Sequence, residues 1–141
     1  MVGILLVTHN GLGDSLLDCV EHVLGSVPAH VKSLSVQADE DPHQKEAEGR
    51  ALIESLDDGD GVLLLADMYG ATPSNIGRRL CEAPHVAGVA GVNLPMLLRV
   101  VCCSSKTLEE MEARAIEGGR ECIIPMNHPE GCHVATGCAN H

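Results

Sequence analysis

Apolar runs alternate along the chain with segments in which apolar residues recur at helical spacing. The runs fall at about residues 2–7, 31–36, 61–66 and 86–92, and they are hydrophobic throughout rather than at every second position. Unbroken hydrophobicity is typical of strands that are buried on both faces of a parallel sheet. The pattern predicts an α/β fold with a single doubly wound, mostly parallel sheet in the order 2-1-3-4 and helices on both faces.

The helices between and after these strands are expected to begin and end at residues that suit helix ends. The residues predicted to cap helix starts are Asp41, Thr72, Asn93 and Thr107. A proline follows Asp41 and Thr72 directly, in the first helical turn, where its missing N–H costs little. Glycine is predicted to end the first helix at Gly25 and the last at Gly118–Gly119.

One domain accounts for the whole pattern. The chain has 141 residues and 45% hydrophobic content, which is enough for a single core. Residues 1–125 hold all the predicted elements, ending in a short edge strand at about residues 122–124. Residues 126–141 contain glycine, proline and polar residues without periodicity, so we expect a mobile C-terminal tail.

Chain composition restricts the location and the partners. The longest apolar runs are far shorter than the roughly 20 residues of a membrane span, and no basic segment precedes the first apolar run, so neither membrane insertion nor secretion is expected. Seven cysteines without a CxxC pair favour a compartment that keeps thiols reduced, which predicts a cytoplasmic protein. A formal charge of −11 and a single aromatic residue argue against nucleic acid as a partner.

Two polar loops are predicted to meet at one edge of the sheet. In the order 2-1-3-4 the strand order reverses between the first and third strands, and ligands bind outside the carboxyl ends of the strands at that point. His9 follows the first strand and Asp67 follows the third. Because neighbouring strands lie about 4.8 Å apart, we expect these two side chains to come within hydrogen-bonding reach.

A histidine oriented by a carboxylate has the chemistry of a phosphoryl acceptor. A carboxylate on one imidazole nitrogen fixes the tautomer and leaves the lone pair of the other nitrogen free for attack. His9 is therefore the expected nucleophile and Asp67 its orienting group. The helix start near Thr72 offers free amides and a positive dipole end to an anion. The residues expected to bind the phosphoryl group are Asn10, Gly70, Ala71, Thr72 and Ser74.

Three segments, in this order, resemble the mannose-type enzyme IIA domains of the bacterial phosphoenolpyruvate-dependent phosphotransferase system. They are residues 3–11 (GILLVTHNG), 67–75 (DMYGATPSN) and 90–97 (AGVNLPML). The resemblance covers about residues 1–125. It implies that His9 accepts phosphate from the histidine-containing phosphocarrier protein and passes it to a IIB-type partner for sugar uptake or regulation. Asp67 would support the imidazole, and Thr72 would lie near the phosphate.

The resemblance also implies an assembly and a loop geometry. It implies a homodimer in which a C-terminal strand, here at about residues 122–124, crosses between subunits. No IIB domain follows in the sequence, so a separate IIB-type protein is the expected acceptor. The family usually has two glycines where this chain has Gly70 and Ala71, so the loop would be strained if the position of Ala71 required a positive φ. No cofactor and no metal are implied.

Other functions place different demands on the sequence. A receiver domain would need an acidic pair after the first strand and a lysine after the fifth, and the sequence offers neither. A flavodoxin would need aromatic rings around the flavin, and the chain has a single aromatic residue. The phosphotransfer subunit of a dihydroxyacetone kinase stays open, since it differs in partner rather than in chemistry. A non-enzymatic metal-binding or adaptor protein would use the His and Cys residues of the tail, although their spacing is not that of a zinc site. These residues are His128, Cys132, His133, Cys138 and His141.

Overall fold

The computed structural model describes residues 1–103 and 105–127. Its sheet has four parallel strands in the order β2-β1-β3-β4, which confirms the predicted fold class and strand order. The strands are β1 (Gly3–His9), β2 (Val31–Val36), β3 (Val62–Ala66) and β4 (Val86–Ala90). The central strands β1 and β3 are the most continuously apolar segments and are buried almost throughout.

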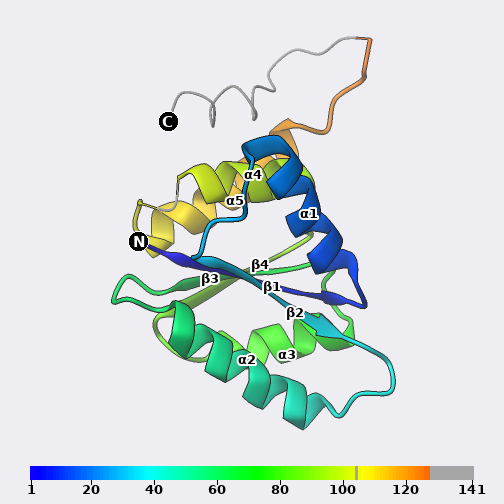
Figure 1. The fold of residues 1–141 in the computed structure, drawn as a ribbon, viewed down its shortest axis with the longest axis vertical. Coiled ribbons are helices and arrows are strands. Elements are labelled where there is room, and N and C mark those ends of the chain that lie inside the picture. The colour runs from blue at the N-terminus through cyan, green and yellow to red at the C-terminus, as the bar shows by residue number, and fades with distance from the viewer. Residues whose placement is uncertain (104, 128–141) are drawn as a thin grey trace.

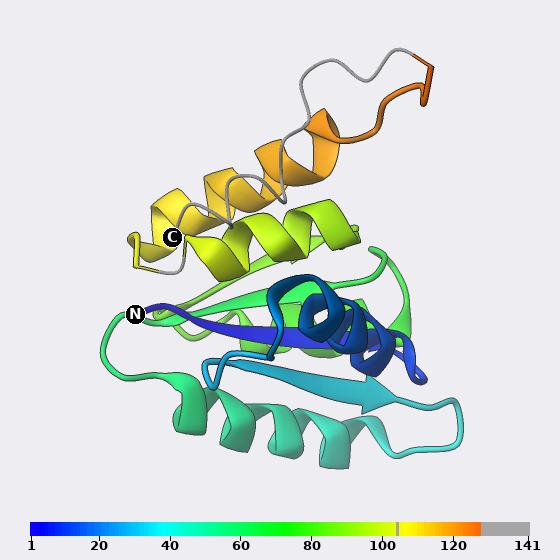
Figure 2. The same cartoon turned by 45° about the horizontal axis from the view of Figure 1, so that its top comes forward.

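Helices cover both faces of the sheet, as predicted (Figures 1 and 2). One face carries α1 (Leu12–Leu24), α4 (Leu94–Cys102) and α5 (Leu108–Glu121), and the other carries α2 (Pro42–Leu56) and α3 (Thr72–Leu80). Each layer closes its own core, because alternate side chains of the strands point to opposite faces. Every helix in the described part of the chain is too short or too polar to cross a membrane.

Side-chain caps fix three helix starts as the sequence predicts. Asp41 accepts a hydrogen bond from the N–H of His43, Asn93 from that of Met96, and Thr107 from that of Glu110. Gly25 ends α1 in the left-handed conformation, with φ +90°. The prediction for Thr72 was wrong in position: Thr72 is the first residue of α3, and Ala71 precedes it as the cap.

The paired glycines near the C-terminus do not end the last helix, contrary to the prediction. α5 continues through Gly118 and Gly119 to Glu121. A Cβ atom on Gly118 would come within 2.9 Å of the Arg99 side chain, and one on Gly119 within 2.8 Å of Met96. The glycines therefore allow α5 to pack closely on α4, and this packing outweighs their low helix propensity.

The expected final strand is not formed by the chain alone. Cys122 caps α5, and residues 123–127 contain no strand. A strand needs a neighbour for its backbone groups, and none of the described elements supplies one there. Most of the predicted tail, residues 128–141, lies outside the described residues, as do the five histidines and cysteines named above for a metal-binding or adaptor role.

Two of the described cysteines are oxidised. Cys19, Cys81 and Cys103 are free, whereas Cys102 and Cys122 are disulfide-bonded. The expectation that all cysteines are reduced was wrong for this pair of residues. Cysteine spacing could not reveal it, because disulfide formation depends on which Cβ atoms the fold brings together.

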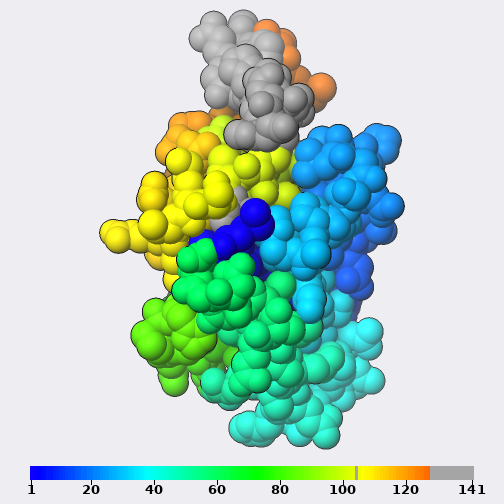
Figure 3. Space-filling view, turned by 60° about the vertical axis from the view of Figure 1, so that its left-hand side comes forward, coloured from blue at the N-terminus to red at the C-terminus, as the bar shows by residue number. Residues whose placement is uncertain are grey.

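At the end of the sheet opposite His9, ion pairs hold the N-terminus against the turn before β3. The N-terminal ammonium group of Met1 forms ion pairs with Asp58 and Asp60 in the turn before β3. In Figure 3 the dark blue N-terminal end of the chain reaches the surface next to the green segment that contains this turn. The carboxylates raise the pKa of the ammonium group, so it stays charged at neutral pH.

We predict that Gly61→Ala is more destabilising than Gly25→Ala. Both glycines have a positive φ, which costs about 1–2 kcal/mol for an alanine. A Cβ atom on Gly61 would also lie 2.6 Å from the carbonyl oxygen of His85, whereas one on Gly25 would meet nothing within 4 Å. The overlap adds about 1–3 kcal/mol. Urea denaturation of both variants measures the difference, and equal losses would show that the chain relaxes around Gly61 without cost.

Candidate active site

His9 lies at the point where the chain leaves the sheet. It is the last residue of β1 and pairs with Val36 of β2. The next residue, Asn10, has a φ of +48°, and its N–H donates to the carbonyl oxygen of Val36 over 3.0 Å. Asparagine tolerates this left-handed conformation better than most residues. The sharp turn leaves the His9 side chain at the edge formed by the carboxyl ends of the strands, which is called the rim below.

Asp67 lies beside His9 because β1 and β3 are neighbours. It directly follows β3, whose last residue, Ala66, pairs with Val7 of β1. The Oδ2 atom of Asp67 accepts two hydrogen bonds from His9, one from the backbone N–H over 2.9 Å and one from the ring Nδ1 over 2.8 Å. The expected contact between the two side chains is therefore present. One carboxylate oxygen holds both the backbone and the ring of the histidine.

The two partners differ sharply in exposure. The side chain of Asp67 is 9% exposed and that of His9 is 44% exposed. Burial alone raises the pKa of Asp67, but the hydrogen bonds from His9 and from the N–H of Met68, together with the nearby ring, hold that pKa below its usual value. The ionised carboxylate thus contributes to stability at neutral pH, and this contribution is lost as the pH falls through the folded-state pKa.

The geometry determines which ring nitrogen of His9 is free. An ionised carboxylate can only accept hydrogen bonds, so in the neutral ring the proton lies on Nδ1. The lone pair then lies on Nε2, on the side of the ring away from Asp67. This is the arrangement that the sequence predicts for a nucleophilic histidine.

Ser74 closes the loop after β3. Its Oγ accepts hydrogen bonds from the N–H groups of Gly70 and Ala71 over 2.9 Å and 3.1 Å, and its hydroxyl donates to the carbonyl oxygen of Ala71. The amides of Gly70 and Ala71, expected to bind phosphate, are therefore already paired within the loop. The positive φ falls on Gly70, at +89°, while Ala71 has a φ of −106°. The strain considered for Ala71 does not arise.

Two free amides remain at the start of α3. The first backbone bond of this helix runs from the N–H of Asn75 to the carbonyl oxygen of Ala71. The N–H groups of Thr72 and Ser74 precede it and lack partners within the helix, and Pro73 has no N–H. Of the five expected phosphate ligands, Thr72 and Ser74 therefore keep backbone amides without a partner in the helix, and Asn10 lies directly beside His9 in the chain.

Two further contacts support the rim. Thr8 is fully buried, and its Oγ1 accepts a hydrogen bond from the N–H of Gly13 over 2.8 Å, which ties the start of α1 to the end of β1. The carbonyl oxygen of Ala66 accepts from the N–H groups of Gly91 and Val92 after β4. Neither contact was predicted from the sequence, although Thr8 is the one polar residue in the first strand before His9.

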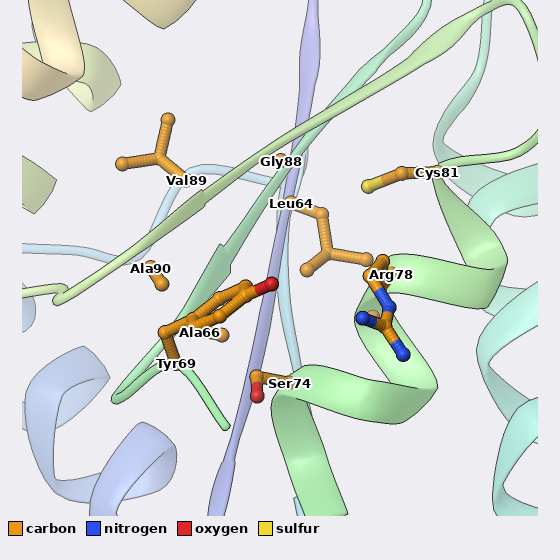
Figure 4. Close-up of a pocket in the computed structure, with 10 residues that line it drawn as sticks. Leu64, Ala66, Tyr69, Ser74, Arg78, Cys81, Gly88, Val89 and Ala90 are labelled. Atoms are coloured by element: carbon orange, nitrogen blue, oxygen red, sulfur yellow. The ribbon is translucent and has the colours of Figure 1, made fainter. Parts of the chain in front are cut away.

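A small cavity shares this loop but not the histidine. It has a volume of about 170 Å³ and lies between α3 and β4, with Tyr69, Ser74 and Arg78 at its polar side (Figure 4). Neither His9 nor Asp67 lines it. Within the described residues, no three His, Cys, Asp or Glu side chains are placed to hold a metal ion.

The fold and the site together define a class of protein. It is a doubly wound α/β domain with a partly exposed histidine, oriented by a carboxylate, at the point where the strand order reverses. Comparison with protein families narrows the class. Residues 3–116 match the EIIA-man family, described as "PTS system fructose IIA component", and the chain belongs to this family. It is a phosphotransferase-system IIA component of the mannose family, as the sequence resemblance implied.

Individual relatives agree with this assignment. The chain is 30% identical over 123 residues to the "PTS system mannose-specific EIIAB component" of Escherichia coli K12, and equally similar to that of Shigella flexneri. These alignments cover 85% of the chain but only 38% of each relative, so the chain spans well under half the length of these proteins.

Solved structures share the fold. An EIIA component from Streptococcus agalactiae superposes with a TM-score of 0.81 at 22% identity, covering 90% of this chain and 98% of that one. The mannose/sorbose-specific IIA subunit from Enterococcus faecalis gives a TM-score of 0.80 at 22% identity, covering 92% and 97%.

We predict that neutral His9 carries its proton on Nδ1. Long-range ¹H–¹⁵N NMR at alkaline pH identifies the protonated ring nitrogen, with His22 on the surface of α1 as an internal reference. In Asp67→Asn the amide can present its NH₂ to Nδ1, which favours the opposite tautomer. A proton found on Nε2 of the wild-type ring would contradict the role given to Asp67.

Proposed function

We propose that the protein is a phosphohistidine relay in which His9 Nε2 accepts a phosphoryl group from the histidine-containing phosphocarrier protein and passes it to a separate IIB-type protein. The observation that carries this proposal is the bond between His9 Nδ1 and Asp67, with Nε2 left free. Family membership supports phosphotransfer in sugar transport, and the acceptor ring at the switch point supplies the chemistry.

Transfer exchanges one phosphorus–nitrogen bond for another. The Nε2 lone pair of His9 attacks the phosphorus atom while the bond from phosphorus to the donor's imidazole nitrogen breaks, and the donor ring leaves with that electron pair. His9 then carries the phosphoryl group on Nε2 and keeps its proton on Nδ1. The ring gains positive character, which the ionised Asp67 stabilises at 2.8 Å. No proton has to move during the step.

The surroundings of the phosphoryl group are polar but contribute no cationic side chain. The amides of Thr72 and Ser74 at the start of α3 favour an anion, helped by the helix dipole. The side chains of Thr72 and Asn10 are the nearby hydroxyl and amide donors. Neither loop beside His9 contains lysine or arginine. Such a site stabilises the charge of the phosphoryl group during transfer without binding the product so tightly that onward transfer stops.

In this proposal Gly70, Ala71 and the hydroxyl of Ser74 act on the loop, and only the backbone amide of Ser74 contributes to the phosphate site. Their mutual hydrogen bonds set the position of Thr72 at the helix start. The phosphotransfer subunit of a dihydroxyacetone kinase would use the same chemistry with another partner, and no contact in the structure favours it.

We also propose a homodimer, in the cytoplasm, built on the open edge of β4. This strand ends the sheet, and its Gly88 and Ala90 are exposed. Cavities of about 170 Å³ and 410 Å³ lie on the two sides of this edge, and both are lined by residues 88–90. Ile123 is 77% exposed, just after α5. A strand from a second subunit would pair the edge and bury these apolar side chains.

We predict that His9 is the one phosphorylated residue when the protein is incubated with phosphoenolpyruvate, enzyme I and the phosphocarrier protein. His9→Ala abolishes the label, and Asp67→Asn slows its appearance by at least about tenfold, because the tautomer is wrong. His22→Ala is the matched control and keeps the wild-type rate. Mass spectrometry and ³¹P NMR locate the label.

The chemical stability of the linkage separates a relay from a receiver domain. Phosphohistidine is lost in acid and survives base, whereas an acyl phosphate on Asp67 hydrolyses in base. A base-labile label that persists in His9→Ala would overturn the relay and favour the receiver function.

We predict that the wild-type protein has twice its 14.8 kDa chain mass in solution and that Ile123→Lys is monomeric. The exposed Ile123 contributes little to the folded single chain, so its replacement acts on the dimer alone. Val23→Lys, at an exposed position on α1, is the matched control and stays dimeric. Light scattering at micromolar concentration distinguishes these states. If the Ile123→Lys variant remains dimeric, the proposed interface at the edge of β4 is wrong.

A further inference from the structure

The cavity between α3 and β4 is open because residues with small side chains line it. Ala66, Gly88 and Ala90 on the sheet and Gly77 on α3 carry at most one side-chain carbon each, and longer side chains at these positions would fill the space. The cavity volume of about 170 Å³ is close to that of an engineered protein cavity of about 150 Å³ that binds benzene. The cavity therefore has room for one apolar group about the size of a benzene ring.

The inner wall of this cavity is apolar. Leu64, which is 2% exposed, reaches it from β3, and the side chain of Cys81 lies at the end nearest to the C-terminus of α3 (Figure 4). Burial raises the pKa of the Cys81 thiol, so this group stays neutral at pH 7. A wall of this kind favours an apolar ligand group over water.

Two polar side chains face the opening of the cavity without partners in the part of the chain that the structure describes. The guanidinium group of Arg78 forms no ion pair there, whereas its neighbour Arg79 is paired with Glu46 over 2.7 Å. The hydroxyl group of Tyr69 also has no hydrogen-bond partner there, and Figure 4 shows Tyr69 and Arg78 on opposite sides of the cavity. The Ser74 hydroxyl, by contrast, is already bound within its loop. A cationic and a neutral donor beside an apolar cavity suit a carboxylate.

We propose that this cavity binds a small carboxylic acid in its ionised form, with an apolar body about the size of a benzene ring. The apolar body lies against Leu64, and the carboxylate accepts hydrogen bonds from Arg78 and Tyr69. A free acid fits better than a protein side chain, because aspartate and glutamate have no apolar group of that size. Neither His9 nor Asp67 lines the cavity, so the site does not depend on the proposed relay.

Benzoate is the probe for this site, and two related compounds separate the contributions of charge and ring. Titrations followed by ¹H–¹⁵N NMR, at constant ionic strength and pH 7, monitor the backbone amides of Tyr69 and Gly77. We expect saturable shifts with benzoate. Binding is expected to be weaker by at least about tenfold for benzamide, which lacks the charge, and for acetate, which lacks the ring.

Two adjacent arginines provide a variant and its matched control. Arg78→Gln is expected to weaken benzoate binding by about tenfold, because the amide cannot replace the charged, two-pronged donor. Arg79→Gln removes the same charge one position further along α3 and keeps the wild-type affinity, since Arg79 is paired with Glu46 and does not line the cavity.

Ala90→Leu tests the apolar part of the site. Residues two apart in a strand point to the same face, so Ala90 shares a face of β4 with Val86, which packs in the core with residues of α3. A leucine at this exposed position extends toward the cavity without replacing a core residue. We expect this variant to lose benzoate binding and to keep the wild-type midpoint in urea denaturation.

Four results would overturn the proposal. The absence of saturable shifts with benzoate in the wild type is the first, and equal affinities for benzoate and benzamide, which would mean that no carboxylate is recognised, are the second. Wild-type affinity in Arg78→Gln would place benzoate elsewhere on the protein. Binding that appears only in the Ile123→Lys variant would mean that a second subunit fills the cavity.

Discussion

The hydrogen bonds from His9 to one oxygen of Asp67 depend on the pairing of β1 with β3. The two residues are 58 positions apart in the chain, and only the register that sets Val7 against Ala66 brings them together. That register is strongly specified because both strands are buried on both faces, where a slip would misplace every side chain. The apolar runs thus determine which polar residues meet. They form the central strands, and the polar residues that directly follow these strands become neighbours at the rim.

A second set of backbone contacts holds the rim in place. The carbonyl oxygen of Ala66 is bound by two amides after β4, and Thr8 binds the start of α1. Ser74 uses its hydroxyl within the loop, which leaves the first amides of α3 pointing away from the helix without partners. The functional groups are therefore positioned by neighbours that never touch a phosphoryl group, and their own polar atoms remain available.

The strand order, the helix caps and the meeting of His9 with Asp67 follow from local sequence signals. Continuous hydrophobicity identifies buried strands, and Asp41, Asn93 and Thr107 cap helices with their own side chains. Tertiary packing decides the cases that sequence reasoning missed. Gly118–Gly119 read as a helix end, yet they serve close contact with α4. The role of Ser74 depends on a loop conformation, and the strand predicted after α5 is absent from residues 123–127 because none of the described elements lies there to pair with it.

The contrast between a buried carboxylate and an exposed ring suits a relay more than a hydrolase. Burying Asp67 makes its attraction for the imidazole stronger, since water does not screen it, while the exposed Nε2 side stays open to a protein donor. A cationic clamp would add affinity for the phosphoryl group equally before and after transfer, which slows release without helping the reaction. With neutral donors at the helix start, discrimination between partners shifts from the phosphate to the surface that surrounds it.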